Sequence, residues 1–475
     1  MSVAPPKVGV MTFGDDRPFE WERVFAAMTV PRHEDLLREL RQWPLEVVAS
    51  DNVARTRTEV DQQVDRLVAD GAEAFLAHTP CWAPPNLVVR GVQRAGLPTA
   101  LVSNRDPSTH GMVGLLGAGG ALDQLGWPHI RVREELGGRA RERLLPFARA
   151  AAVVRRLRGS SCGLFGGRSL GIDTGSVDPM QWRRLFGVDV QTFDQLEIVR
   201  RADGVEGDRV AAIVDWLEET AASIAYDCSS LTPERLELQV RCYLATLDLV
   251  DEQGLDFAAV KCMPELSTDF VPQCLSACLL PMGTPAVAGE AREPFMLACE
   301  ADADGALTMQ MLKLASQGTP AFFADVSYII DSGDLLCLPN CGAFCGWYAA
   351  RSDDAARNMG AIELRPANRK GGGATTYFRA AAGPVTLARL ARKDGRYHLL
   401  VAPGEIVTPA PETTDLFDRA RSRLPLPTAF VRLRGDPEEL VQQLSANHIS
   451  GVAGDVTETL TYVAQLCDIP IQTLL

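Results

Sequence analysis

The sequence has no excess of basic residues and no apolar run of about 18 residues, the length that spans a membrane. Its first residues also lack the basic region and apolar core of a signal peptide. With 47 Lys and Arg against 61 Asp and Glu, the net charge is −14. This balance argues against nucleic acid as the main partner, because phosphate binding needs clustered basic side chains. We therefore expect a soluble cytoplasmic protein with neither a nucleic-acid nor a membrane partner.

Cysteine is plentiful, but no CxxC pair is present. The 12 Cys are spread along the chain, most of them inside apolar runs. That placement is typical of small buried hydrophobic residues in a reducing compartment. The nearest approach to a cluster is Cys337, Cys341 and Cys345 in a loop with Pro and Gly. A zinc site there is an alternative, although no His lies nearby in the sequence.

A chain of 475 residues usually divides into two or three domains. Strand-like and helix-like segments alternate through residues 1–140, and a second alternation fills residues 141–330, which predicts two doubly wound α/β domains. Residues 331–475 contain short alternating runs separated by Gly, Pro and Asp, which favours antiparallel β structure in a small barrel or sandwich.

Two carboxylates stand at the ends of two neighbouring apolar runs. Residues 295–299 form a short run that ends on Glu300, and residues 320–324 form another that ends on Asp325. We expect both runs to be buried strands of one parallel sheet, which would bring the two carboxylates to the edge where open α/β sheets bind ligands. Carboxylates there cost desolvation free energy unless a cation meets them, so a divalent metal is one interpretation.

The other interpretation of this segment is purely local. Acidic residues at strand ends often cap helices or pair with Arg, and Asp302 or Asp304 would cap the helix that opens at Gly305. Asp302 could also orient a metal ligand from behind. The local pattern leaves these alternatives open.

The six His residues do not point to a site by spacing alone. His448 lies in Ser-Ala-Asn-His-Ile-Ser-Gly, directly after an amphipathic helix predicted at residues 437–445. A lone His is more often a cap or a core residue than a metal ligand. Nothing in the residue pattern around His448 decides between these roles.

Several short motifs follow one another in a fixed order along the chain. They are Thr79-Pro80-Cys81-Trp82, Gly114-Leu115-Leu116, Gly166-Gly167-Arg168-Ser169, Asp178-Pro179, Glu197-Ile198-Val199-Arg200-Arg201, Arg292-Glu293-Pro294-Phe295, Glu300 with Asp302, Phe323-Ala324-Asp325-Val326, Gly371-Gly372-Gly373 and Ala446-Asn447-His448. In this order they resemble the L-fucose isomerases and their L-arabinose isomerase relatives. The resemblance covers nearly the whole chain, which is shorter than typical L-fucose isomerases.

The resemblance implies a fold of two Rossmann-like domains and a β-rich C-terminal domain. It also implies one divalent cation, usually Mn²⁺, with Mg²⁺ or Co²⁺ as alternatives, bound by Glu300, Asp325 and His448. In the family the same two carboxylates move protons, so Glu300 and Asp325 are the implied catalytic residues. Family members assemble as homo-oligomers, usually trimers or hexamers, in which the first domain of one subunit closes the active site of its neighbour.

The substrate contacts of the family carry over unevenly. Arg17 and Trp82 match sugar-contacting positions, expected to come from a neighbouring subunit, and Asn447 matches the Asn before the metal-binding His. Three other positions depart from the family pattern. Met263 stands where the family has Gln, Ala374 where it has Tyr with Tyr377 close by, and Ala429 where it has an aromatic residue.

These departures predict an altered sugar specificity, because polar groups that bind a hydroxyl discriminate strongly between substrates. The leading hypothesis is a metal-dependent aldose–ketose isomerase that converts an open-chain monosaccharide through a cis-enediol. The alternatives are an isomerase or epimerase of another pentose or modified hexose, and a non-catalytic sugar-binding protein on the same scaffold. Lys261, at the end of a predicted strand, is expected to pair with an acid.

Overall fold

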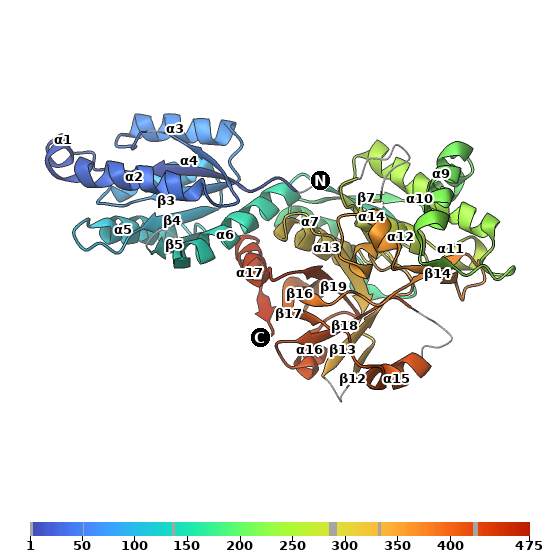
Figure 1. Cartoon of the computed structure of the whole chain (residues 1–475). Coiled ribbons are helices and arrows are strands. Elements are labelled where there is room, and N and C mark those ends of the chain that lie inside the picture. The colour runs from blue at the N-terminus through green and yellow to red at the C-terminus, as the bar shows by residue number, and fades with distance from the viewer. Residues whose placement is uncertain (1–2, 51, 135–137, 285–291, 331–333, 421–425) are drawn as a thin grey trace. The chain divides into compact units, whose positions relative to one another are not determined.

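The computed structural model describes residues 3–50, 52–134, 138–284, 292–330, 334–420 and 426–475 (Figure 1). The chain folds into two compact units. The N-terminal unit contains residues 3–156 and 458–468, and the second unit contains residues 157–457 and 469–475. The predicted boundary at residue 331 lies outside the described residues, and the division into three domains stays a prediction. Among the helices of the described ranges, none is both long and apolar enough to cross a membrane.

The N-terminal unit is built on a five-stranded parallel sheet in the order β2-β1-β3-β4-β5. Its strands are β1 (Lys7–Thr12), β2 (Glu46–Ala49), β3 (Ala74–His78), β4 (Thr99–Ser103) and β5 (His129–Arg133). This order is that of a doubly wound fold, as the alternation of segments predicts. The sequence pattern does not reveal β5, because Val132 is its one buried residue and no apolar run marks it.

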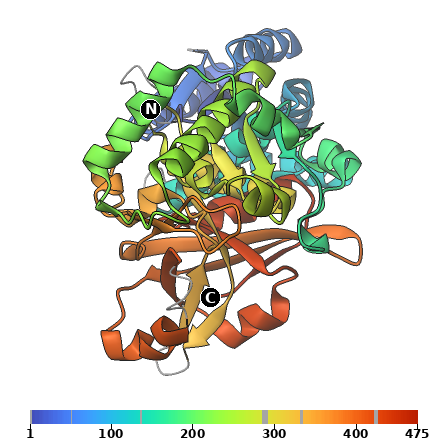
Figure 2. The ribbon, with the colours of Figure 1, turned by 90° about the vertical axis from the view of Figure 1, so that its right-hand side faces the viewer.

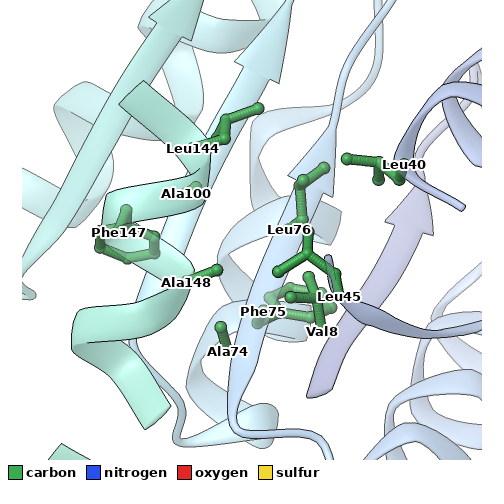
Figure 3. Close-up of a pocket in the computed structure, with 10 residues that line it drawn as sticks. All are labelled: Val8, Leu40, Leu45, Ala74, Phe75, Leu76, Ala100, Leu144, Phe147 and Ala148. Carbon is green, nitrogen blue, oxygen red and sulfur yellow. The ribbon is translucent and has the colours of Figure 1, made fainter. Parts of the chain in front are cut away.

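Helices cover both faces of this sheet. Those of the unit are α1 (Pro18–Glu20), α2 (Ala26–Leu40) after a π-helical turn (Trp21–Phe25), α3 (Arg57–Ala69), α4 (Pro85–Ala95), α5 (Gly111–Gln124), α6 (Gly138–Leu157) and α17 (Thr457–Leu466). The apolar faces of α3, α4 and α5 form one core cluster with side chains of β1, β3 and β4. On the opposite face, Figure 3 shows Leu40 of α2 and Leu144 and Phe147 of α6 around Leu76 of β3. The small pocket between them is lined by apolar residues and is core space.

The second unit contains a four-stranded parallel sheet in the order β10-β9-β6-β7. Its strands are β6 (Ser161–Phe165), β7 (Asp189–Phe193), β9 (Phe257–Val260) and β10 (Met296–Ala298). The helices that accompany it are α7 (Pro179–Leu185), α8 (Leu196–Ala202), α9 (Gly207–Thr220), α10 (Pro233–Gln253), α11 (Glu265–Asp269), α12 (Cys274–Met282) and α13 (Ala303–Ala315), with a 3-10 turn at Asp173–Gly175. A parallel α/β arrangement was expected here, although β7 is not evident from the sequence.

The C-terminal part of the second unit is a large, mostly antiparallel sheet in the order β11-β19-β16-β17-β18-β13-β12, with β20 beside β17. Its strands are β11 (Ala321–Asp325), β12 (Tyr328–Ile330), β13 (Leu335–Pro339), β16 (Gly383–Lys393), β17 (Arg396–Ile406), β18 (Thr428–Leu433), β19 (His448–Ala453) and β20 (Ile471–Thr473). Figure 2 shows the β16–β17 hairpin as a long orange ribbon. Its two-residue turn, Asp394-Gly395, has positive φ at both positions, which suits the twist of a tight hairpin.

Smaller elements complete the second unit. They are a three-stranded sheet of β8 (Ser223–Ile224), β14 (Glu363–Pro366) and β15 (Ala374–Tyr377), the helices α14 (Ala355–Met359), α15 (Pro411–Ala420) and α16 (Pro437–Gln443), and a 3-10 turn at Gly346–Ala349. The expected antiparallel β structure of the C-terminal region is therefore present, as an open sheet with β11 and β12 at the two ends of its strand order.

The prediction that the strands before Glu300 and Asp325 share one parallel sheet is wrong. β10 lies at the edge of the parallel sheet, whereas β11 belongs to the C-terminal sheet and pairs antiparallel with β19. The helix between them, α13, is buried along all 13 of its residues because it packs between the two sheets. A short apolar run does not reveal which sheet a strand joins, because a strand buried on both faces looks alike in either.

Candidate active site

Strand pairing brings the predicted His and one of the predicted carboxylates together. β11 ends on Asp325, β19 begins on His448, and the two residues are direct partners in the antiparallel ladder. Side chains that face each other in this way lie about 5 Å apart at Cβ and can touch. Asp325 Oδ1 is 3.4 Å from His448 Nε2. The sheet itself therefore fixes this pair.

Glu300 reaches the same imidazole nitrogen from the other sheet. It follows β10 in a tight turn, where Glu300 and Ala301 both have positive φ, at 59° and 53°. The turn is held by the amide of Ala301, which donates to the carbonyl of Val260 at 2.9 Å. Glu300 Oε2 lies 3.1 Å from His448 Nε2. The three residues predicted as metal ligands thus converge on one point, although they come from two sheets.

Asp302 supports this point from behind the imidazole. Its carboxylate is fully buried and lies 2.8 Å from His448 Nδ1. The same carboxylate caps α13 by accepting from the amide of Gly305 at 2.8 Å. The predicted helix cap is therefore present, and the same carboxylate also contacts the imidazole of His448. A carboxylate on Nδ1 fixes that nitrogen as a proton donor and directs Nε2 toward Glu300 and Asp325.

Arg389 on β16 neutralises Asp302, and sequence reasoning did not find it. Its guanidinium donates to both carboxylate oxygens, at 2.7 and 3.1 Å, and both side chains are fully buried. It also donates to the carbonyl of Thr174 at 2.9 Å. The available signal was an Arg at a buried position of the apolar strand run 385–391, because a buried charge needs a partner.

A second buried carboxylate, Asp304, lies in the first turn of α13. Its Oδ1 accepts from Trp182 Nε1 at 3.1 Å and from the hydroxyl of Tyr397 at 2.8 Å. Its Oδ2 has no hydrogen-bond partner among the described residues, and Arg392 Nε lies 3.8 Å from it. Burial raises the pKa of Asp304 to about 7, despite the opposing effect of Arg389. Asp304 therefore holds helix α13 to Trp182 and Tyr397.

The charges around His448 shift three pKa values. Burial acts to lower the pKa of His448, but the carboxylates of Asp302, Asp325 and Glu300 outweigh it and raise that pKa well above its usual value. Burial raises the pKa of Glu300, against the lowering effect of His448. Burial opposes ionisation of Asp302, yet Arg389 and His448 hold its pKa far below the usual range. The site thus favours a positive charge on or beside Nε2.

Within the described ranges, no group of three or more His, Cys, Asp and Glu side chains stands ready to hold a metal ion. The donor set around Nε2 nevertheless suits one. Glu300 and Asp325 form ion pairs with His448 and with no Lys or Arg of the described chain. Two adjacent ligands of an octahedral Mg²⁺ or Mn²⁺ ion lie about 3 Å apart, given metal–ligand distances of about 2.1 Å. The distances of 3.1 and 3.4 Å to Nε2 are close to that value.

The other predicted site residues divide between the two units. Asn447, directly before His448, places its side-chain nitrogen 3.0 Å from His448 Nε2, and its oxygen accepts from the hydroxyl of Thr174 at 3.4 Å. Asn447 therefore borders the site. Arg17 and Trp82 belong to the N-terminal unit, where Arg17 pairs with the buried Asp15 at 2.6 Å. Their role as sugar contacts from a neighbouring subunit stays a prediction.

Met263, which departs from the family pattern, and the nearby residues Tyr377 and Lys261 each have a local partner. The carbonyl of Met263 accepts from the hydroxyl of Ser169 at 2.7 Å. Tyr377 lies under the guanidinium of Arg365, 3.6 Å from the ring centroid. Lys261 pairs with Glu265 at 2.6 Å, which confirms the expected partnership with an acid.

Comparison with known proteins gives two matching family profiles. The first, "L-fucose isomerase, first N-terminal domain", matches residues 5–159, and the second, "L-fucose isomerase, C-terminal domain", matches residues 338–474. A sulfoquinovose isomerase from Alkalicoccus urumqiensis is 23% identical over 415 residues, which are 85% of this chain and 86% of that protein. An L-fucose isomerase from Phocaeicola vulgatus is 36% identical over 80 residues, 16% of this chain and 14% of that protein.

Among solved structures, an ABC transporter periplasmic solute-binding protein from Actinobacillus succinogenes 130z with bound D-allose is 12% identical, covering 55% of this chain and 79% of that chain. Its TM-score of 0.17 is too low to support an inference. The two family profiles together cover more than half of the chain, and they span the strand that carries His448. The chain therefore belongs to the L-fucose isomerase family and is a sugar isomerase of the aldose–ketose type.

Proposed function

We propose that this chain interconverts an open-chain aldose and its 2-ketose through a cis-enediol, with a divalent cation held by Glu300, Asp325 and His448. Mn²⁺ is the expected cation, and Mg²⁺ or Co²⁺ are alternatives. The observation that carries the proposal is the convergence of two carboxylates on His448 Nε2, at 3.1 and 3.4 Å. When bound, such a cation supplies Lewis-acid polarisation of the carbonyl and hydroxyl oxygens of the sugar.

The chain's own residues have distinct tasks in this proposal. Asp302 and Arg389 keep the imidazole of His448 in the orientation that presents Nε2, because the Asp302 carboxylate occupies Nδ1. The side chain of Glu300 is 10% exposed and that of Asp325 is 38% exposed. The sugar therefore approaches from the side of Asp325, and Glu300 forms the inner wall of the site.

Isomerisation moves two hydrogens and leaves the formula of the sugar unchanged. A carboxylate removes the proton from C2 of the aldose and returns it to C1, while the hydroxyl proton of O2 passes to O1. Glu300 and Asp325 are the carboxylates at the site, and one of them acts as the base on carbon. Burial raises the pKa of Glu300, which suits a group that must carry a proton between two carbons.

The sugar is proposed only by class. The relative that matches 85% of this chain is named for sulfoquinovose, so a modified hexose stands beside a deoxy-hexose or a pentose as the substrate. An epimerase acting through the same enediol, and a sugar-binding protein without turnover, remain the competing functions. A homo-oligomer of three or six subunits, completed by Arg17 and Trp82 of a neighbour, is part of the proposal.

The test is a panel of aldoses and ketoses followed by NMR in D₂O. We expect one aldose–ketose pair to interconvert with deuterium entering at C1 or C2, EDTA to abolish the reaction and Mn²⁺ to restore it. Glu300→Gln and His448→Ala should lose turnover with an unchanged circular dichroism spectrum. Glu265→Gln, at a carboxylate that pairs with Lys261, is the matched control and should keep activity. Activity that survives both EDTA and Glu300→Gln would overturn the proposal.

A further inference from the structure

Four cysteines from four separate segments gather beside Glu300. Cys262 follows β9, Cys274 begins α12, Cys299 follows β10, and Cys341 lies in the loop after β13. The sulfurs of Cys299 and Cys341 are 3.7 Å apart. Cys274 Sγ is 3.6 Å from the carbonyl oxygen of Cys341. The sequence spacing had suggested a cluster of Cys341 with its neighbours in the loop, whereas the fold sets its thiol against a cysteine from another sheet.

The thiols of Cys299 and Cys341 belong to residues of different exposure. Cys341 is partly exposed, whereas Cys299 is buried at 3% exposure. Cys341 is therefore the more accessible residue of the two, and the buried Cys299 is in place to complete a bond.

We propose that Cys299 and Cys341 form a reversible disulfide when the protein meets hydrogen peroxide, and that this disulfide switches the isomerase site off. The sulfur of Cys341 attacks one peroxide oxygen, the O–O bond breaks, and a sulfenic acid and water are formed. The sulfur of Cys299 then displaces the sulfenic oxygen as a second water. Two thiols are oxidised to one disulfide and one hydrogen peroxide is reduced to two waters.

The position of Cys299 links this bond to the site. Cys299 directly precedes Glu300, whose left-handed backbone conformation depends on the surrounding turn. A disulfide requires the sulfurs to approach from 3.7 Å to about 2.05 Å, which pulls on that turn. The effect on Glu300 follows because no residue separates it from the moving segment.

The loop of Cys341 is tied to the second carboxylate strand. Asn340 Nδ2 donates to the carbonyl of Phe323 at 3.2 Å, two residues before Asp325 on β11. Closure of the disulfide therefore acts on the segments that carry Glu300 and Asp325. The consequence for activity rests on the proposed function, whereas formation of the disulfide does not.

The experiment uses the full-length protein, reduced, freed of reductant and then treated with hydrogen peroxide. Non-reducing peptide mass mapping should find a cross-linked pair of peptides carrying Cys299 and Cys341. Activity on the identified sugar should fall about 10–100-fold, the range seen when support of a metal ligand is lost. Dithiothreitol should restore it.

Two variants test the assignment and a third controls it. Cys341→Ser and Cys299→Ala should each abolish the cross-link, and each variant should keep its activity after peroxide treatment. Two variants are used so that the test still works if one of them folds poorly. Cys228→Ser removes an exposed cysteine and should change neither result. Free thiols at both positions after peroxide, a bond to a different cysteine, or a cross-link with unchanged activity would each overturn the proposal. If the cross-link forms but the protein never shows isomerase activity, the disulfide between Cys299 and Cys341 is supported and the proposed function is contradicted instead.

Discussion

The carboxylate of Asp302 lies 2.8 Å from Nδ1 of His448, and both side chains are buried. Arg389 holds the opposite side of the same carboxylate through two hydrogen bonds. This chain of Arg, Asp and His links helix α13 to the C-terminal sheet, because Asp302 caps α13 while Arg389 and His448 lie on β16 and β19. The orientation of the candidate metal-binding nitrogen therefore depends on a residue that the sugar does not need to touch.

The first prediction concerns Asp302→Asn. Asparagine can still cap α13, but it leaves the guanidinium of Arg389 buried without its counter-charge, and we expect the free energy of unfolding to fall by about 3–5 kcal/mol. Loss of the carboxylate on Nδ1 should also weaken Mn²⁺ binding about 10–100-fold. Urea unfolding and calorimetric titration with Mn²⁺ measure the two effects.

The matched control removes the opposite charge. Asp302→Asn combined with Arg389→Met takes away both members of the pair, so its loss of stability should be smaller than the sum of the two single losses. Its Mn²⁺ affinity should remain as low as in Asp302→Asn. Strictly additive losses of stability would show that Asp302 and Arg389 act independently.

The second prediction concerns pH and Asp304. The pKa of this carboxyl is about 7 in the folded protein, against an ordinary value of 3.8, so between these values the folded state binds more protons than the unfolded chain. The free energy of unfolding should therefore decrease as pH rises through this window, with a slope approaching about 1.4 kcal/mol per pH unit. Asp304→Asn does not titrate, so its stability relative to the wild type should increase from about pH 4 to about pH 7 and then level off.

Urea unfolding at several pH values tests this relation. Asp178→Asn serves as the control, because its amide donor Gln181 lowers the pKa of Asp178 and both states are already ionised above about pH 5. Its stability difference from the wild type should not change across the window. If the difference in unfolding free energy between Asp304→Asn and the wild type also stayed constant with pH, Asp304 would be ionised in the folded protein.

The third prediction concerns close packing at Gly305. A Cβ at this position would lie 2.5 Å from the ring of Phe323, and that ring lies against His448 with centroids 4.5 Å apart. We expect Gly305→Ala to destabilise the protein by about 1–3 kcal/mol, as overpacking of a core does, and to lower activity through the displaced His448. Gly120→Ala on α5 is the control, since a Cβ there meets nothing within 4 Å and should stabilise by about 0.4–1 kcal/mol. Thermal unfolding of both variants decides the comparison.

The sequence predicted many of the elements near their observed limits. The apolar run 320–324 corresponds to β11 within one residue, and the helix predicted at residues 437–445 contains α16. Strands without a continuous apolar run were missed, as β5 and β7 show, because their burial comes from neighbours and not from their own composition. The convergence of Glu300, Asp325 and His448 was expected from the family resemblance, since the residue pattern alone did not select His448.

By itself the sequence determined the α/β class, the acidic net charge, and two apolar runs that are each followed directly by a carboxylate. Only the tertiary structure decided that these strands lie in different sheets, that Asp302 and Arg389 orient His448, and that Cys341 faces Cys299. The reason is physical. Local periodicity indicates which residues are buried. The partner of a buried charge or thiol is set by contacts between segments far apart in the chain, and such contacts produce no recognisable residue spacing in the sequence.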